Sequence, residues 1–349
     1  MSTAFRFCIP QRITQRGAGL GNELHGYAKV CLAAGELRAR SLLPAWGRNP
    51  RGYWRYFKSS RLDWLYQTLL VSALPTYVFD EEQYLATGEH DFRRAVRAYA
   101  DHHGLDSRSA FAFVTGGMWG GMSILRPAFP FVRRMLYSAT GTAKNLSDLD
   151  QRIPEGRLVI SIHVRRGEFA SQLPNNDVPA WAQWNWALPL DWYIAVCRSI
   201  EDQLDVPHSF VLFTDGTPDE VRPLIAEIEP ITLFDQRMSV CSDLLAMASA
   251  DLLICSRSSF SIWAAALSSK PYVWPAESLY RTSEYLAIWD HGEPPVADAE
   301  DSSRQLPRGI PIDSSGVVPL DLITYLESVH SRKALTSDLV FYGRIPRSN

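Results

Sequence analysis

Two adjacent arginines, Arg165 and Arg166, stand where the strand-like run Leu158–Val164 ends. The run is apolar and β-branched, which is typical of a parallel strand buried on both faces. Open α/β sheets bind their ligands at the carboxyl ends of such strands. With the imidazole of His163 before them and the carboxylate of Glu168 after them, the two guanidiniums predict a site for phosphate or another anion. The alternative is a surface arginine pair that forms a salt bridge with Glu168.

Two other segments place polar groups where a helix begins or a strand ends. The glycine turn 17–22 precedes a segment with helical spacing at 27–37, and Asn22 is a candidate N-cap. Its glycine spacing matches neither the dinucleotide fingerprint nor a Walker loop. Asp215 closes the strand-like run 208–215. The ordinary alternatives are a simple turn for the glycines and a helix N-cap for Asp215.

A serine-rich segment, 256–261, follows a predicted strand at 252–255 and leads into a predicted helix at 260–267. It supplies hydroxyls and backbone amides, and both can hold phosphate oxygens. The alternative is an ordinary serine helix cap. Together with Asp243, these segments share a position at strand ends or helix starts, which favours a common anion site.

The composition limits the class of protein. A chain of 349 residues is expected to form two domains, and 46% apolar and 21% charged residues are ordinary for a soluble globular protein. A net charge of -3 argues against a nucleic-acid binder or a broad anionic-membrane binder. We find neither a signal-peptide core nor an apolar run that could span a bilayer. The five cysteines are widely spaced and form no CxxC pair, which predicts reduced thiols and a cytoplasmic location; they are Cys8, Cys31, Cys197, Cys241 and Cys255.

The pattern of elements predicts an α/β protein. The polar segment 138–156 is the predicted linker, and after about 288 the sequence predicts a loop with one helix near 320–326. In the second half, predicted strands alternate with predicted helices, which indicates a parallel sheet with helices on both faces. We expect strands at 41–44, 76–79, 111–115, 158–164, 208–215, 231–234, 252–255 and 272–274. Helices are expected at 27–37, 62–72, 91–102, 192–204, 217–228, 241–249 and 260–267.

These motifs resemble the α1,2-fucosyltransferase family and are similar to the related α1,6- and protein O-fucosyltransferases. The resemblance extends from about residue 17 to 275. It implies a GT-B type fold with two Rossmann-like domains facing across a cleft, and GDP-fucose as the donor. It also implies inversion at the anomeric carbon and no metal. The motifs are Gly-Leu-Gly-Asn-x-Leu (19–24), His-x-Arg-Arg-Gly-acid (163–168), Phe-Thr-Asp (213–215) and the run from Asp251 to Ser-Ser-Phe-Ser (251–261), with Asp243 before it.

The resemblance also implies a domain layout and roles for single residues. Residues 1–150 would form the acceptor-side domain, 151–290 the nucleotide-sugar domain, and 291–349 an extension that packs back on them. Arg165 would bind the β-phosphate, His163 the ribose or diphosphate, and Asp243 the guanine edge. Ser258 and Ser259 would hold phosphate oxygens, while Gly21 and Asn22 would approach the diphosphate from the first domain. The predicted donor-binding residues are Gly21, Asn22, His163, Arg165, Arg166, Asp215, Asp243, Ser258, Ser259 and Phe260.

Sugar transfer also needs a base for the acceptor hydroxyl. Glu168 is the first choice because it follows the arginines, although its alternative task is to orient Arg165. Glu23 is the second choice and Asp177 the third. The family usually has aspartate at the position of Glu168 and glutamine at that of Glu23. The predicted catalytic residues are therefore Arg165, Glu168 and Glu23, and activation of the acceptor by water or the leaving phosphate would need no carboxylate.

We predict no metal site. The Asp-x-Asp triplet 148–150 lies in the polar linker without a preceding strand and is interpreted as a solvated acidic turn. Arginine and helix amides would then stabilise the leaving group, each preorganised donor contributing roughly 3 kcal/mol. The residues 169–188 look like an insertion. Within it and just after it stand Trp181, Trp184, Trp186 and Trp192, which either stack on a sugar or fill a core.

The sequence therefore predicts a metal-independent, inverting glycosyltransferase that moves fucose from GDP-fucose to a hydroxyl of a carbohydrate or glycosylated small molecule. Two alternatives stay open: a GT-B transferase that uses another nucleotide sugar, and a non-catalytic protein that binds a nucleotide or sugar phosphate. A working base would separate the enzyme from the binding protein.

Overall fold

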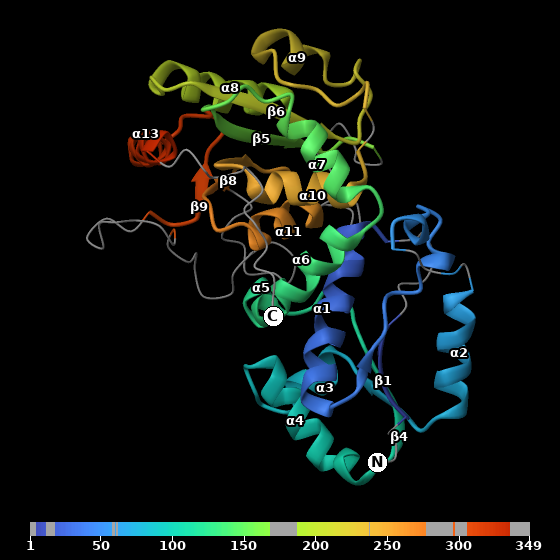
Figure 1. Cartoon of the computed structure of the whole chain (residues 1–349). Helices are drawn as coiled ribbons and strands as arrows, with labels where there is room; N and C mark the ends of the chain where they lie inside the picture. The colour runs from blue at the N-terminus through green and yellow to red at the C-terminus, as the bar shows by residue number, and fades with distance from the viewer. Residues whose placement is uncertain are drawn as a thin grey trace, which may run out of the picture. The chain divides into compact units, whose positions relative to one another are not determined.

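The structure is a computed structural model that describes residues 5–11, 18–57, 60, 62–167, 187–236, 238–276, 296 and 306–335 (Figure 1). The described residues fall into two compact units, one up to Gly141 and one from Thr142 onward. The boundary predicted from the sequence lies after residue 150, whereas residues 142–150 belong to the second compact unit. The acceptor-side and donor-side roles of the two units stay predictions.

The first unit is built on a four-stranded sheet in the order β2-β1-β4-β3, and every pair of neighbouring strands is parallel. Helix α2 lies on one face of the sheet and α1 on the other (Figure 1). Leu70 of α2 and Leu74, which follows the helix, pack against the cluster of Phe7 and Ile9 from β1. The strands are β1 (Phe5–Pro10), β2 (Arg40–Ser41), β3 (Thr76–Phe79) and β4 (Ala110–Thr115). The helices are α1 (Leu20–Leu37), α2 (Asp63–Ala73), α3 (Glu81–Ala86), α4 (Phe92–His102), α5 (Met122–Leu125) and α6 (Phe129–Ser138).

A buried lysine links helix α1 to the loop that follows β4. Lys29 lies inside α1, is fully buried, and its Nζ donates hydrogen bonds to the carbonyl oxygens of Gly116, Gly117 and Trp119 at 3.3, 3.2 and 2.7 Å. The ammonium also lies 3.1 Å from the centroid of the Trp119 ring. Burial holds the pKa of Lys29 well below its usual range. Three acceptors and an aromatic face thus compensate an otherwise costly buried group, and they fix the loop that follows β4.

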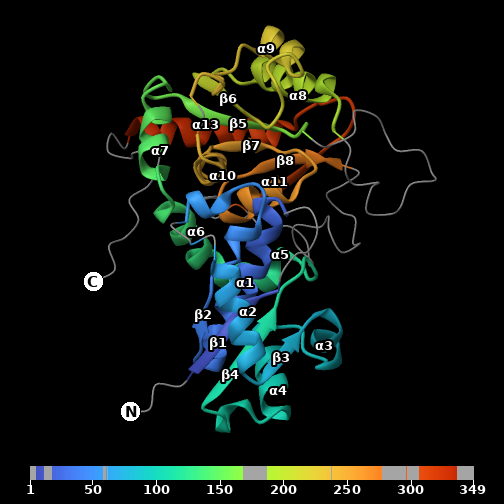
Figure 2. The same cartoon turned by 90° about the vertical axis from the view of Figure 1, so that its right-hand side faces the viewer.

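The second unit has a five-stranded parallel sheet in the order β6-β5-β7-β8-β9. Helices α8 and α9 lie on one side of it and α10 and α11 on the other (Figure 2). The strands are β5 (Leu158–Val164), β6 (His208–Thr214), β7 (Leu252–Ile254), β8 (Tyr272–Pro275) and β9 (Gly309–Ile312). The helices are α7 (Thr142–Asp150), α8 (Leu190–Gln203), α9 (Arg222–Ile228), α10 (Val240–Ser249), α11 (Ser259–Leu267) and α13 (Leu320–Leu335).

Strand β5 divides its side chains between the two helical layers. All seven residues are buried. Leu158, Ile160, Ile162 and Val164 share a core with α8, α9 and α13. Because side chains alternate along a strand, Val159, Ser161 and His163 point to the opposite face, toward α10 and α11. The first strand of this unit therefore carries an apolar face and a face that ends in an imidazole.

The order of the strands also places a ligand site. The chain runs from β5 outward to β6 and then returns to the other side of β5 with β7, so the winding direction reverses between β5 and β7. In open α/β sheets, ligands bind in the crevice at the carboxyl ends of the strands at such a switch point. In this unit that point lies beyond Val164 and Ile254.

The predicted α/β class with two Rossmann-like parallel sheets is confirmed, and several sequence-based details are wrong. The linker 138–156 contains α7, whose Leu146 and Leu149 are buried. The expected strand 231–234 is reduced to a single bridge between Val211 and Ile231. Strands β1 and β9 were not expected, and the helix near 320–326 extends to Leu335.

No helix in the described part of the chain combines the length and apolar character needed to cross a membrane. All five cysteines lie in that part, all are buried, and none of them forms a disulfide there.

Candidate functional site

The carboxyl end of β5 carries a buried imidazole in a cluster of serine hydroxyls. His163 is 4% exposed, and its Nδ1 lies 2.6 Å from Oγ of Ser261 and 2.9 Å from Oγ of Ser256. Its ring also packs against Phe260, with the centroids 5.4 Å apart. Burial, with the nearby Arg165 charge, lowers the pKa of His163 to about 3. The imidazole is therefore neutral at physiological pH and acts as a fixed hydrogen-bonding group.

The serines belong to the start of helix α11. Ser258 is its N-cap, and its side chain accepts a hydrogen bond from the Ser261 amide at 3.2 Å. Ser261 Oγ in turn accepts from the Ser256 amide at 3.0 Å. Ser258, Ser259 and Phe260 are partly exposed, whereas Ser256 and Ser261 are buried. The outer residues are therefore accessible at a helix N-terminus, where backbone amides and the helix dipole favour an anion.

Arg165 and Asp215 join the carboxyl ends of β5 and β6. Arg165 Nη1 donates to Asp215 Oδ2, and Asp215 Oδ1 accepts from the Arg166 amide at 2.7 Å. The predicted N-cap role of Asp215 is wrong, because α9 begins only at Arg222. Arg165 therefore forms a salt bridge with Asp215, whereas the alternative salt bridge with Glu168 stays a prediction because Glu168 lies outside the described residues. Donor binding by Asp215 stays a prediction.

Gly167 allows this turn to close. Its φ is +38°, and an added Cβ would lie 2.3 Å from Asp215 Oδ2. A positive φ favours glycine, and the short distance to Asp215 leaves no room for the Cβ of any other residue type at position 167. Arg166 packs against the loop after β6, because a Cβ added at Gly216 would lie 2.9 Å from its Cγ and 3.0 Å from its Cβ. Its Nε is buried without a hydrogen-bond partner among the described residues. The arginine pair therefore provides one guanidinium beside Asp215 and a second arginine whose Cβ and Cγ pack against the loop after β6.

Asp243 is a second candidate group of this unit. It lies in the first turn of α10, which Ser239 caps through the Ser242 amide at 3.1 Å. Burial raises the pKa of Asp243 to about 7. The described residues offer its carboxyl no hydrogen-bond donor. An uncompensated carboxyl of this kind is common at functional sites.

The glycine turn belongs to the other unit. Helix α1 begins at Leu20 with Gly19 as its N-cap, so the predicted N-cap role of Asn22 is wrong. Gly21 is buried and its carbonyl accepts from His25 Nδ1 at 2.9 Å. Glu23 follows in the same turn, and its Oε1 accepts from Asn49 Nδ2 at 3.0 Å. Gly21, Asn22 and Glu23 are therefore attached to a different sheet from His163 and Arg165.

Some predicted residues lie outside the described part of the chain. These are the first-choice base Glu168, the alternative base Asp177 and the tryptophans Trp181, Trp184 and Trp186. Trp192 is described, and it is a core residue whose Nε1 donates to the Asp313 carbonyl at 2.9 Å.

The contacts of the Asp-x-Asp triplet 148–150 indicate a structural role. The triplet lies in α7 and not in a turn, and Asp148 Oδ2 accepts from Lys144 Nζ at 2.5 Å and Gln236 Nε2 at 2.8 Å. Asp148 therefore fastens α7 to the loop before α10. Within the described ranges, no group of three or more His, Cys, Asp and Glu side chains is arranged to hold a metal ion.

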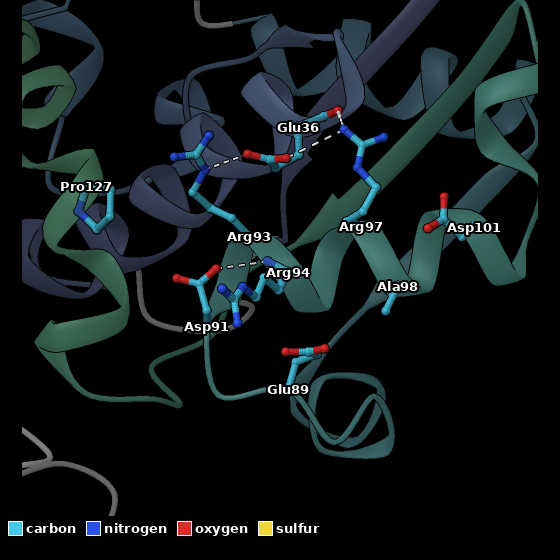
Figure 3. Close-up of a pocket in the computed structure, with 9 residues that line it drawn as sticks. All are labelled: Glu36, Glu89, Asp91, Arg93, Arg94, Arg97, Ala98, Asp101 and Pro127. Atoms are coloured by element: carbon cyan, nitrogen blue, oxygen red, sulfur yellow. Dashed lines mark hydrogen bonds and ion pairs between the residues drawn. The ribbon is translucent and has the colours of Figure 1, made fainter.

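Two surface hollows lie away from these groups. A cavity of about 550 Å³ lies over the outer face of α4, where Glu36 sits between Arg93 and Arg97 (Figure 3). A second, of about 330 Å³, lies at the amino ends of β5 and β6 beside Arg157 and His208. Neither is at the switch point, and paired opposite charges line the first. We therefore locate the candidate site from the side chains at the carboxyl ends of β5, β6 and β7, and not from a cavity.

Sequence reasoning missed two residues of the His163 cluster as site residues, Ser256 and Ser261. Both stand in the serine-rich segment, and the spacing from Ser258 to Ser261 is the signature of an N-cap and its N3 residue. Asn49 was also missed, because it lies in an irregular segment and contacts Glu23 only through the fold.

Comparisons with known proteins give weak likenesses. No family model matches the chain, and no curated protein matches it. Among solved structures, the α1,6-fucosyltransferase NodZ soaked with GDP-fucose matches 76% of this chain and 93% of its own, at 15% identity and a TM-score of 0.44. POFUT1 in complex with GDP-fucose matches 77% and 95%, at 10% identity and a TM-score of 0.44. NodZ from Bradyrhizobium matches 76% and 94%, at 16% identity and a TM-score of 0.42. These values are too low to assign the chain to a family or an activity.

Proposed function

We propose that the protein is a glycosyltransferase that moves a sugar, fucose, from its GDP-linked form to an acceptor hydroxyl. The observation that carries this proposal is the convergence of three segments at the switch point of the second sheet. The end of β5 carries His163 and Arg165, the N-cap Ser258 of α11 follows β7, and Asp215 follows β6. A neutral imidazole, a helix N-terminus and a guanidinium together suit a nucleotide diphosphate.

The same groups can stabilise the nucleoside diphosphate as it leaves the sugar. When the bond between sugar and diphosphate breaks, negative charge grows on the β-phosphate. Arg165 is 20% exposed at its side chain and already oriented by Asp215, so it can meet this charge with little rearrangement. The amides at the start of α11 would act on the same charge. Transfer without a metal follows as part of the proposal, because arginine and amides perform the task that a divalent cation performs elsewhere.

Finer points of the proposal rest on the resemblance to fucosyltransferases. They are GDP-fucose as the donor, inversion at the anomeric carbon, and a carbohydrate or glycosylated small molecule as the acceptor. Asp243 would recognise the guanine edge, and a cytoplasmic location follows from the cysteine pattern. A transferase that uses another nucleotide sugar and a non-catalytic binding protein remain the competing hypotheses.

The experiment that tests the proposal is a donor screen with the purified full chain. GDP-fucose, GDP-mannose, UDP-glucose and ADP-glucose are each incubated with the protein, and released nucleotide and sugar products are measured by mass spectrometry. We expect turnover of GDP-fucose in the presence of EDTA. Turnover of only another donor would replace fucose, and binding without any turnover would favour the non-catalytic protein.

A further inference from the structure

Helix α2 of the first unit carries apolar side chains on two faces. Its inner face packs on the sheet through Leu70, and there Gln67 Nε2 donates a hydrogen bond to the Leu43 carbonyl at 2.7 Å. A second set of apolar side chains begins at the N-cap of the helix and recurs at spacings of three and four residues, which places its members on one face. We call this set the outer stripe. Its members are between 40% and 61% exposed, and they are Leu62, Leu65, Tyr66 and Leu69.

The hydroxyl groups beside the outer stripe form hydrogen bonds within the helix. Thr68 Oγ1 donates to the Trp64 carbonyl at 2.7 Å, and Ser72 Oγ donates to the Thr68 carbonyl at 2.9 Å. A hydroxyl that is bonded in this way loses less when water is removed from around it. Helix α2 also forms the outer layer of its unit on this face of the sheet (Figure 1). An exposed apolar surface of this kind marks an interaction site.

A guanidinium lies beside the start of the outer stripe. The 3₁₀ turn η1 (Trp46–Arg48) is attached to the first turn of α2, because Asp63 Oδ1 accepts from the Gly47 amide at 3.2 Å. Arg48 ends this turn and is exposed, and its guanidinium lies 3.7 Å from the centroid of the Trp64 ring. The fold therefore places a cation and an indole next to the apolar side chains.

The surrounding sequence has a strong local excess of positive charge. From Arg38 to Phe79 it contains seven basic residues and one acidic residue, Asp63, in a chain whose net charge is -3. Arg51 and Arg55 belong to this stretch and are exposed. The overall charge argues against a broad basic face, but it leaves room for a basic flank beside a single helix.

An anionic lipid surface is the partner whose chemistry fits this combination. The outer stripe would enter the boundary between headgroups and acyl chains, while tryptophan and arginine side chains lie at the level of the lipid phosphates. A second copy of this chain fits less well. A two-fold dimer through α2 would bring two sets of arginines to one interface.

We propose that the outer stripe of α2, together with the flanking Arg48, Arg51 and Arg55, docks the protein reversibly onto an anionic lipid surface. The docking is peripheral, because only one side of a helix enters the lipid. It goes beyond the proposed function, and it needs neither a sugar donor nor an acceptor. The two proposals can therefore fail independently.

The test is co-sedimentation of the full chain with lipid vesicles. One preparation contains phosphatidylcholine alone, and the other contains equimolar phosphatidylcholine and phosphatidylglycerol. We expect strong partitioning only onto the second preparation, and weaker partitioning when salt is added, because the arginines interact with the anionic headgroups. Equal partitioning of wild type onto both preparations, or none onto the anionic vesicles, would overturn the proposal.

A double variant tests the apolar part. Leu62→Gln with Leu69→Gln should lower the partition coefficient on anionic vesicles about tenfold or more, since two exposed leucines no longer enter the lipid. The matched control is Leu85→Gln with Leu320→Gln, which alters two leucines outside the stripe that are each 68% exposed. The control should keep the wild-type coefficient. The same coefficient for wild type and both variants would overturn the role of the stripe.

A second double variant tests the basic flank. Arg48→Gln with Arg55→Gln should also lower partitioning onto anionic vesicles about tenfold. The control, Arg198→Gln with Arg222→Gln, removes as much charge from exposed arginines of the second unit. Equal losses in both would show that net charge alone governs binding and would overturn the local site.

Sedimentation velocity without vesicles distinguishes the competing occupant. We expect wild type and the variant Leu62→Gln with Leu69→Gln to have the same oligomeric state. A wild-type dimer that this variant splits, combined with no partitioning onto anionic vesicles, would assign the face to a second copy of the chain and overturn the lipid proposal.

Discussion

Arg165 and Asp215 are joined through both oxygens of one carboxylate. Oδ2 accepts from the Arg165 guanidinium, while Oδ1 accepts from the Arg166 amide at 2.7 Å. Asp215 thereby fixes the direction of the side chain and the course of the backbone that follows β5. The ion pair is partly exposed, so its value lies in positioning Arg165 more than in stability.

Replacing Asp215 separates positioning from charge. Asp215→Asn removes a negative charge beside the phosphate site, which by Coulomb's law alone should tighten GDP binding. We expect the opposite, a Kd for GDP about tenfold higher, or about 1.4 kcal/mol, because Arg165 loses its fixed direction. Titration calorimetry measures the Kd. Asp235→Asn, which removes a surface partner of Arg152, is the matched control. Tighter binding by Asp215→Asn would contradict the positioning role.

Gly167→Ala tests the same turn from the backbone. The variant suffers both a positive φ and a Cβ that would meet Asp215 Oδ2 at 2.3 Å. Gly156→Ala is the control, since its φ is +78° with nothing within 4 Å of the added Cβ. We expect both to lose about 1–2 kcal/mol from the backbone conformation, and only Gly167→Ala to lose the rise in Tm caused by GDP. Equal GDP stabilisation of the two variants would show that the turn is not part of the site.

The burial of His163 predicts a pH effect on stability. Its pKa is about 3 in the folded protein and near 6.5 in an unfolded chain, so the unfolded state binds the proton more readily. The neutral imidazole therefore favours folding fully above pH 6.5, and that contribution is lost as the pH falls toward 3. The stability of wild type relative to His163→Gln should fall by roughly 2 kcal/mol between pH 7 and pH 5.

Urea unfolding of both proteins at pH 5, 6 and 7 gives this difference. The other buried groups that titrate, such as His25 and Asp243, are present in both proteins and cancel. A difference that does not change with pH would mean that His163 is protonated as easily in the folded protein as in the unfolded chain.

Asp243 predicts how base recognition depends on pH. Its carboxyl has a pKa of about 7 and must be ionised for both of its oxygens to accept hydrogen bonds from the guanine edge. The preference for GDP over ADP should therefore fall about tenfold from pH 8 to pH 6. The ratio is used because the phosphates of both nucleotides titrate alike. Asp243→Asn should show a small preference that is independent of pH. A wild-type ratio that is equally constant would remove Asp243 from guanine recognition.

The sequence predicted the elements that are strongly patterned. Leu158–Val164 was expected as a strand and is β5, because a continuous β-branched run has few alternatives to a buried parallel strand. The start of α11 was readable because serine caps have a local signature. Helix α7 was missed, since it lies within the polar segment 138–156, whose composition hides the buried pair Leu146 and Leu149.

The site was predicted only as far as it depends on local sequence pattern. His163 lies near the end of β5 and the two arginines follow it, so predicting the strand also predicted that these residues lie at the carboxyl edge of the sheet. The Arg165–Asp215 pair and the Glu23–Asn49 contact join segments 50 and 26 residues apart, and no spacing in the sequence indicates them. The packing of Arg166 against Gly216 was equally hidden, because it depends on the course of the loop after β6.

The central claim is that Arg165 binds the phosphate of a nucleotide without help from a divalent ion. The most direct test is titration calorimetry of GDP in EDTA with wild type, Arg165→Ala and the control Arg198→Ala, whose guanidinium pairs with Glu227 on the surface. We predict that wild type and Arg198→Ala bind GDP with the same Kd, and that Arg165→Ala binds at least tenfold more weakly. Equal binding by all three proteins, or binding by wild type only after a divalent metal is added, would contradict the claim.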